Sequence, residues 1–110
     1  MNLADLKSKG GFVSDKPVRK EVEWTRKVDG KKVTDKFVIH IRPMAYGDIE
    51  RIFIDKDGED RSKTAALLAE SVLLGEEGAE RLSYTDAYQL SPSLAAALAK
   101  VVNEVNALKN

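Results

Sequence analysis

The sequence lacks cysteine and has a single histidine, three prolines and few aromatic residues. Without cysteine the chain can form neither a disulfide framework nor a thiolate metal site, and a reducing compartment is expected. With His40 as the only histidine, a zinc site built on two histidines is excluded as well. Aromatic residues make up 6% of the chain, so leucine, valine, isoleucine and alanine must supply most of the core, a balance that favours helices.

The chain also lacks an excess of either charge and a long apolar run. Eighteen basic residues balance eighteen acidic ones, which removes any global electrostatic argument for nucleic acid or an anionic membrane. The charge is uneven locally: residues 16–42 hold nine basic and four acidic residues, and residues 48–60 hold two and six. The longest apolar stretches, 65–74 and 94–102, are shorter than the roughly 18 residues of a membrane span. Residues 1–7 lack the apolar core of an export signal.

The length and pattern predict one α+β domain over residues 1–110, mainly helical, with an N-terminal β-hairpin packed on three to four C-terminal helices. Hydrophobic residues make up 43% and charged residues 33%, a composition that can bury a core. We expect three parts, which are a flexible N-terminal arm (residues 1–15), a β-hairpin (16–42) and a helical part (43–110).

The hairpin prediction rests on alternating apolar residues on both sides of Asp29-Gly30. This dipeptide favours a two-residue type I′ turn, whose two central residues need positive φ. Such a turn places Val22 opposite Phe37 and Val18 opposite Ile41, so that the bulky side chains share one face. A two-stranded ribbon is marginal alone, so we expect this face to pack on helices or on another subunit.

Helical spacing dominates the rest of the chain. We predict a short helix over residues 3–9 and four more over residues 43–54, 62–74, 83–90 and 92–108. In the last of these, with Ser91 as N-cap and Pro92 at the first position, apolar residues alternate steps of four and three, the seam spacing of helices packed at a shallow angle.

No motif for catalysis or cofactor binding is recognisable. The acidic loop that begins at Asp55 fails as a calcium loop, because Gly58 stands at position 4 instead of 6 and Ala66 stands where the bidentate glutamate belongs. His40 has the strand parity of a surface or pairing residue, and no G-x-S-x-G, G-x-G-x-x-G or Walker-type loop accompanies it. We therefore predict a protein that is not an enzyme, with no catalytic, cofactor-binding or metal-binding residues.

Two features suggest binding to other molecules. The basic hairpin around Trp24 could approach a phosphate backbone, although lysine and arginine also commonly protect exposed strand edges. The C-terminal half carries more apolar surface than so short a chain can easily cover. We predict that a partner helix binds a groove on the last helix, lined by Leu98, Val101, Val105 and Leu108.

Four stretches resemble the tail assembly chaperones of bacteriophages with long, non-contractile tails. They are RPMAYGD at 42–48, SKTAALLAESV at 62–72, LSYTDAYQLSPSL at 82–94 and VNEVN at 102–106. The resemblance covers about residues 16–106. Because these are fold and packing stretches, no family binding residue can be transferred to an individual position.

The resemblance implies a chaperone made in the cytoplasm of the bacterial host and absent from the mature virion. Such proteins coat the tape measure protein, keep that long helical chain soluble, and help recruit tail tube subunits. They self-associate, in some cases as open spirals. In many such phages a ribosomal frameshift adds a second domain that contacts the tail tube protein, and the present chain would be the short product. Two alternatives are a nucleic-acid-binding module that uses the basic hairpin, and a structural tail or head-completion protein.

Overall fold

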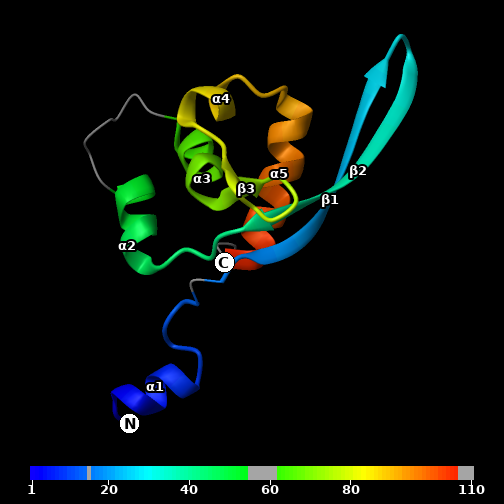
Figure 1. Ribbon diagram of the computed structural model, residues 1–110. Helices are drawn as coiled ribbons and strands as arrows, with labels where there is room; N and C mark the ends of the chain where they lie inside the picture. The colour runs from blue at the N-terminus through cyan, green and yellow to red at the C-terminus, as the bar shows by residue number, and fades with distance from the viewer. Residues whose placement is uncertain (15, 55–61, 107–110) are drawn as a thin grey trace.

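The structure is a computed structural model that describes residues 1–14, 16–54 and 62–106. Its longest element is a β-hairpin of two eleven-residue strands, β1 (Val18–Val28) and β2 (Lys31–Ile41), at the right of Figure 1. Asp29 and Gly30 form the turn between them, with φ values of 52° and 79°. Both values are positive, as a type I′ turn requires, and so the predicted two-residue turn is confirmed.

This turn sets the register of the whole hairpin. Val22 lies opposite Phe37, and Val18 lies opposite Ile41, as the sequence predicted. Because side chains alternate between the two faces, the buried Val22, Ile39 and Ile41 point to the same side of the sheet. That face is the one on which the helices pack.

The hairpin belongs to a four-stranded antiparallel sheet with the order β1-β2-β3-β4. The two additional strands are β3 (Val72–Leu74) and β4 (Glu80–Arg81). The expectation of a mainly helical protein with a two-stranded hairpin is therefore wrong, and the fold is α+β with a larger sheet. The predicted helix over residues 62–74 ends three residues early, and the segment after it contains a strand.

Pairing with β2 explains why the helix does not continue. Val72 pairs with Ile41, and both side chains are completely buried. The main-chain N–H of Arg42 donates to the oxygen of Ser71 at 2.8 Å, which extends the contact to the last residue of the helix. Val72 is β-branched, and such residues favour the extended conformation. Hydrogen bonds to the edge of β2 therefore make Val72 a strand residue.

The helices otherwise follow the predicted order. They are α1 (Leu3–Ser8), α2 (Tyr46–Ile49), the π-helix η1 (Glu50–Ile54), α3 (Lys63–Ser71), α4 (Tyr84–Tyr88) and α5 (Pro92–Asn106). Ser83 caps α4 by accepting a hydrogen bond from the N–H of Asp86, and α5 begins at Pro92, as predicted. None of these helices has the combination of length and apolar composition that a membrane crossing requires, as far as the described residues extend.

The core lies between the sheet and the two longest helices. α5 packs along the first half of β1, and α3 packs on both α4 and α5 (Figure 1). Ile39 and Ile41 of the sheet, Leu68 of α3 and Val102 of α5 are fully buried in this core. The turn end of the hairpin projects beyond α5, and α1 lies apart from the other elements (Figure 1).

Candidate protein-binding surfaces

Three of the four residues predicted to bind a partner lie on α5, at different depths. Leu98 and Val101 face the core and are only 3% and 6% exposed. Val105 is half-buried at the edge of the core, and Leu108 lies outside the described residues. Leu98 and Val101 already contact the chain's own core, so the surface that α5 offers is its C-terminal end. That a partner helix binds these four residues stays a prediction.

Two polar contacts fix α5 against the hairpin. The Nε1–H of Trp24 in β1 donates to Oγ of Ser93, in the first turn of α5, at 2.9 Å. Near the other end of α5, Lys20 Nζ lies 3.1 Å from Glu104 Oε2. The sheet and the helix are therefore held together at both ends of their contact, and Trp24 acts as a packing residue.

The basic hairpin keeps its surplus of positive charge near the turn. Arg26 stacks on the ring of Trp24, 3.9 Å from its centroid, and pairs with Asp35 on the opposite strand. Lys27 and Lys32 lie directly opposite each other in the ladder, an arrangement that costs stability because the charges are alike. An acidic molecule would relieve this repulsion, but the aromatic ring on which a base could stack is already covered by Arg26.

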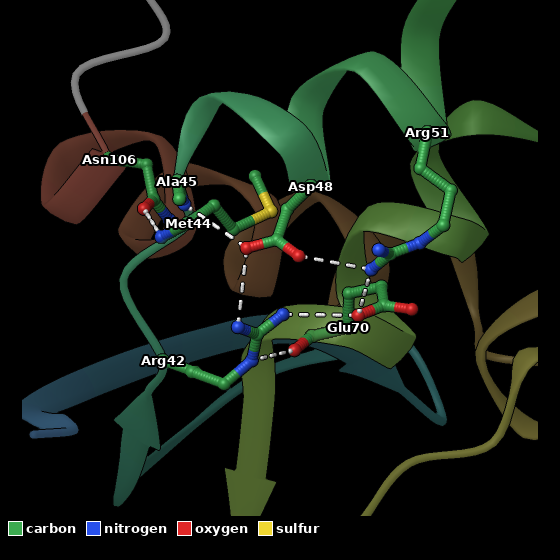
Figure 2. Close-up of polar contacts among 7 residues, drawn as sticks. All are labelled: Arg42, Met44, Ala45, Asp48, Arg51, Glu70 and Asn106. Atoms are coloured by element: carbon green, nitrogen blue, oxygen red, sulfur yellow. Dashed lines mark hydrogen bonds and ion pairs between the residues drawn. The ribbon is translucent and has the colours of Figure 1, made fainter. Parts of the chain in front are cut away.

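A cluster of four charged side chains joins the residue after β2 to α2, η1 and α3. Figure 2 shows this charge cluster of Arg42, Asp48, Arg51 and Glu70. Arg42 lies 3.3 Å from Asp48 and 3.0 Å from Glu70, and Arg51 lies 3.0 Å from each of the same two carboxylates. Each carboxylate thus contacts both guanidinium groups, so the charges alternate around a closed circuit. Arg42 also donates through Nε to the main-chain oxygen of Glu70 at 3.0 Å.

The surroundings of the charge cluster shift two pKa values. Burial alone would raise the pKa of Asp48, but the N–H of Ala45 and the positive charge of Arg42 outweigh it and lower that pKa below its ordinary value. The negative charge of Glu70, followed by the hydrogen bond to Asp48, raises the pKa of Arg51. Both shifts favour the charged forms of Asp48 and Arg51, so these two groups form an ion pair at neutral pH.

A neighbouring hydrogen bond ties the same segment to α5. The N–H of Met44 donates to Oδ1 of Asn106 at 2.6 Å, and Asn106 in turn donates to the main-chain oxygen of Val102 at 3.2 Å (Figure 2). Met44 itself is buried. The chain between β2 and α2 is thus fixed to the end of α5 by Asn106 and to α3 by the charge cluster.

Comparison with known protein families decides what kind of protein this is. The sequence matches the family described as phage tail assembly chaperone, TAC, over residues 4–106. The chain belongs to this family. The resemblance drawn from the sequence is thereby confirmed at the level of the family. Comparisons with curated proteins and with solved structures give no match.

Membership of the tail assembly chaperones implies a role that is not enzymatic. The charge cluster agrees with this role, because its groups satisfy one another and brace the fold. No group of three or more histidine, aspartate or glutamate side chains within the described residues is arranged to hold a metal ion. Most of the acidic loop weighed above as a calcium site, from Asp55 to Asp60, lies outside those residues.

The chaperone also exposes apolar side chains that the sequence analysis did not single out. Leu3, Leu6, Phe12 and Val13 of the N-terminal arm are between 42% and 58% exposed. Periodicity could not have identified them, because a six-residue helix is too short to show which of its faces is covered. The structure shows that neither face of α1 is covered, since no residue of this helix is buried.

Proposed function

We propose that this tail assembly chaperone binds the tape measure protein, keeps it soluble and helps to recruit tail tube subunits around it. The observation that carries the proposal is the family match, which spans residues 4–106 and so includes every described element of the fold except the start of α1. The proposal also places the protein in the cytoplasm of the bacterial host and outside the mature virion.

The proposed binding rests on contact between apolar surfaces of the chaperone and the tape measure protein. A long helical partner presents apolar stripes, and a second helix can be laid against such a stripe in the helix-in-groove mode. In this proposal Val105 and Leu108 contact the partner, while Leu98 and Val101 hold α5 in place from the core side. One such contact is weak, but many chaperone copies on one long chain gain from multivalency.

The test compares two substitutions on the same helix. Val105→Lys places a charge in the proposed contact, and Asn103→Lys places the same charge at an exposed position nearby. We expect Val105→Lys to reduce co-purification with the tape measure protein of the same phage, and Asn103→Lys to leave it unchanged. If both variants fold and co-purify like the wild type, α5 does not provide the contact.

The two alternatives make different predictions. A nucleic-acid-binding module would bind DNA or RNA with an affinity that falls steeply as salt is added, whereas an apolar contact depends little on salt. A structural tail or head-completion protein would remain in purified particles, where mass spectrometry detects it. We expect neither binding of nucleic acid at low salt nor the chain in finished particles.

A further inference from the structure

The outer edge of β2 has a partner strand over only a short part of its length. On one side β1 pairs with all eleven residues of β2. On the other side β3 pairs only with His40 and Ile41. In the part of the chain that the structure describes, residues 31–39 of β2 therefore have no neighbouring strand on that side. Figure 1 shows the turn end of this open edge projecting away from the helices.

The register of the hairpin shows which residues present their main chain to the open edge. The residues that flank the two-residue turn form the first hydrogen-bonded pair, and pairs with and without mutual hydrogen bonds then alternate. Lys32, Thr34 and Lys36 belong to the pairs without them, so their main-chain N–H and C=O groups point away from β1. His40 belongs to the same alternating series, and it pairs with Leu73 of β3 across this edge.

The side chains near the open edge are mostly basic. Residues 26–36 hold five basic and two acidic residues. One of the acidic residues, Asp35, pairs with Arg26. In contrast, Lys31, Lys32 and Lys36 are exposed and form no ion pair with any residue that the structure describes. Because side chains alternate along a strand, Lys32 and Lys36 lie on the same face of the sheet.

These lysines determine which kind of strand the edge can accept. Lysine on a strand edge is a common protection against pairing with another edge. The protection acts through charge repulsion, so it excludes a basic strand, including the same edge of a second copy, but attracts an acidic one. Lys27 of β1 lies directly opposite Lys32 and adds to the positive charge, whereas Glu23 opposite Lys36 offsets it only farther from the turn. The edge therefore favours a strand with acidic side chains.

The open edge favours a polypeptide over a nucleic acid. It presents main-chain N–H and C=O groups in alternation, and an extended polypeptide satisfies both, as in strand addition to other sheet edges. A phosphodiester backbone presents only acceptors, so it would leave the carbonyl groups of the edge without partners. The ring of Trp24, on which a base could stack, is covered by Arg26.

We propose that the outer edge of β2, over residues 31–37, binds an acidic, extended segment of a partner protein as an additional β-strand. The added strand lies beside β2 in line with β3, and its acidic side chains, at alternate positions, lie next to Lys32 and Lys36. A segment of about six residues is long enough, since this is a usual strand length. The contact is separate from the one proposed on α5, so each proposal can fail without the other.

A peptide of about ten residues that alternates glutamate and threonine is the probe, because all its glutamates share one face when it is extended. Titration into the isotope-labelled full chain, followed by nuclear magnetic resonance, measures both the affinity and the site. We expect the amide signals of residues 31–37 to shift. The N–H groups of Lys32, Thr34 and Lys36 should also become protected from hydrogen exchange, as strand addition requires. Shifts without this protection would overturn the proposal.

Three further ligands separate strand addition from simple charge attraction. The same peptide with lysine in place of glutamate should not bind. A version of the glutamate peptide that is N-methylated at every residue keeps the charge but has no N–H groups, and it should bind about tenfold more weakly or less. If it binds as well as the unmodified peptide, or if a single-stranded DNA oligonucleotide binds the same residues more tightly, the edge is not a site for an acidic strand.

Variants of the full chain test the charges and the main chain separately. The double variant Lys32→Glu with Lys36→Glu should weaken binding of the glutamate peptide about tenfold or more. Lys100→Glu, the same change at an exposed position on α5, should leave it unchanged. Thr34→Pro removes an outward N–H without altering a charge and should also weaken binding. Thr34→Val is its control, because both variants lose the contact between the hydroxyls of Thr34 and Thr25 at 2.9 Å.

Two results with these proteins would overturn the proposal. The first is wild-type affinity for the glutamate peptide in the double lysine variant, or in a Thr34→Pro variant that circular dichroism shows to be folded. The second is protection of the same N–H groups that rises with protein concentration in the absence of peptide, because a second copy would then occupy the edge.

Discussion

The side chain of Arg42, the residue that follows β2, contacts both the carboxylate and the main-chain oxygen of Glu70 in α3. Its Nη2 lies 3.0 Å from Oε2 of Glu70, and its Nε donates to the main-chain oxygen of Glu70 at 3.0 Å. Glu70 stands immediately before Ser71, whose oxygen accepts the hydrogen bond from the N–H of Arg42. One arginine therefore fixes the point at which α3 becomes β3.

Removing this arginine should destabilise the fold. Arg42→Ala deletes three hydrogen bonds of a side chain that is 31% exposed, and we expect a loss of about 1–3 kcal/mol in the free energy of unfolding. Arg51→Ala is the matched control, because it removes the more exposed arginine of the charge cluster and should cost less. Urea unfolding followed by circular dichroism measures both. Equal losses for the two variants would show that Arg42 has no special role.

The charge cluster should also make stability depend on pH. Because the pKa of Asp48 is lower in the folded chain than in the unfolded chain, its stabilising effect is complete above about pH 4 and is lost as the pH falls through the lowered value. Asp48→Asn keeps an oxygen for the N–H of Ala45 but removes the charge. The difference in unfolding free energy between wild type and variant should stay constant from about pH 7 to about pH 4 and shrink as the pH falls further. A difference independent of pH would contradict this account.

The turn between β3 and β4 should depend on glycine at position 78. Gly78 has a φ of 70°, and a Cβ there would lie 3.2 Å from Cβ of His40. We expect Gly78→Ala to cost about 1–2 kcal/mol, since the left-handed conformation and the close approach both oppose a side chain. Gly47→Ala is the control: it lies in α2 with no neighbour within 4 Å, and should leave stability unchanged or raise it by up to about 1 kcal/mol. Thermal unfolding of both variants tests this prediction, which requires a lower melting temperature for Gly78→Ala than for Gly47→Ala.

Trp24 and Ser93 should be energetically coupled. Trp24→Phe removes the indole N–H but keeps a ring beneath Arg26, and Ser93→Ala removes the acceptor. In a double-mutant cycle we expect a coupling of about 0.5–1.5 kcal/mol, the value of one hydrogen bond. Additive effects of the two substitutions would show that the hydrogen bond does not help to hold α5 on the hairpin.

The sequence was most informative where local chemistry decides the structure. Asp29 and Gly30 determine a turn of two residues, and the turn then fixes which side chains face each other along both strands. The N-cap at Ser83 and the start of α5 at Pro92 likewise depend on neighbouring residues only. These features could be predicted because each needs no information from a distant part of the chain.

The features that could not be predicted depend on contacts between residues that lie far apart in the sequence. Val72 becomes a strand residue because β2 offers it hydrogen bonds, and Arg42 meets Glu70 twenty-eight positions away. For the same reason the spacing on α5 could identify an apolar seam but could not show that Leu98 and Val101 are covered by the chain's own core. The charge cluster carries no local signature at all.

The central claim is that this family member acts by covering apolar surface on a tail protein. Its most direct test is to express the tape measure protein of the same phage with and without this chain, and to measure the fraction of tape measure protein that stays in the supernatant after centrifugation. We predict that most of it stays soluble and co-purifies with the chain only when both are present. A soluble fraction that is the same with and without the chain, and no co-purification, would contradict the claim.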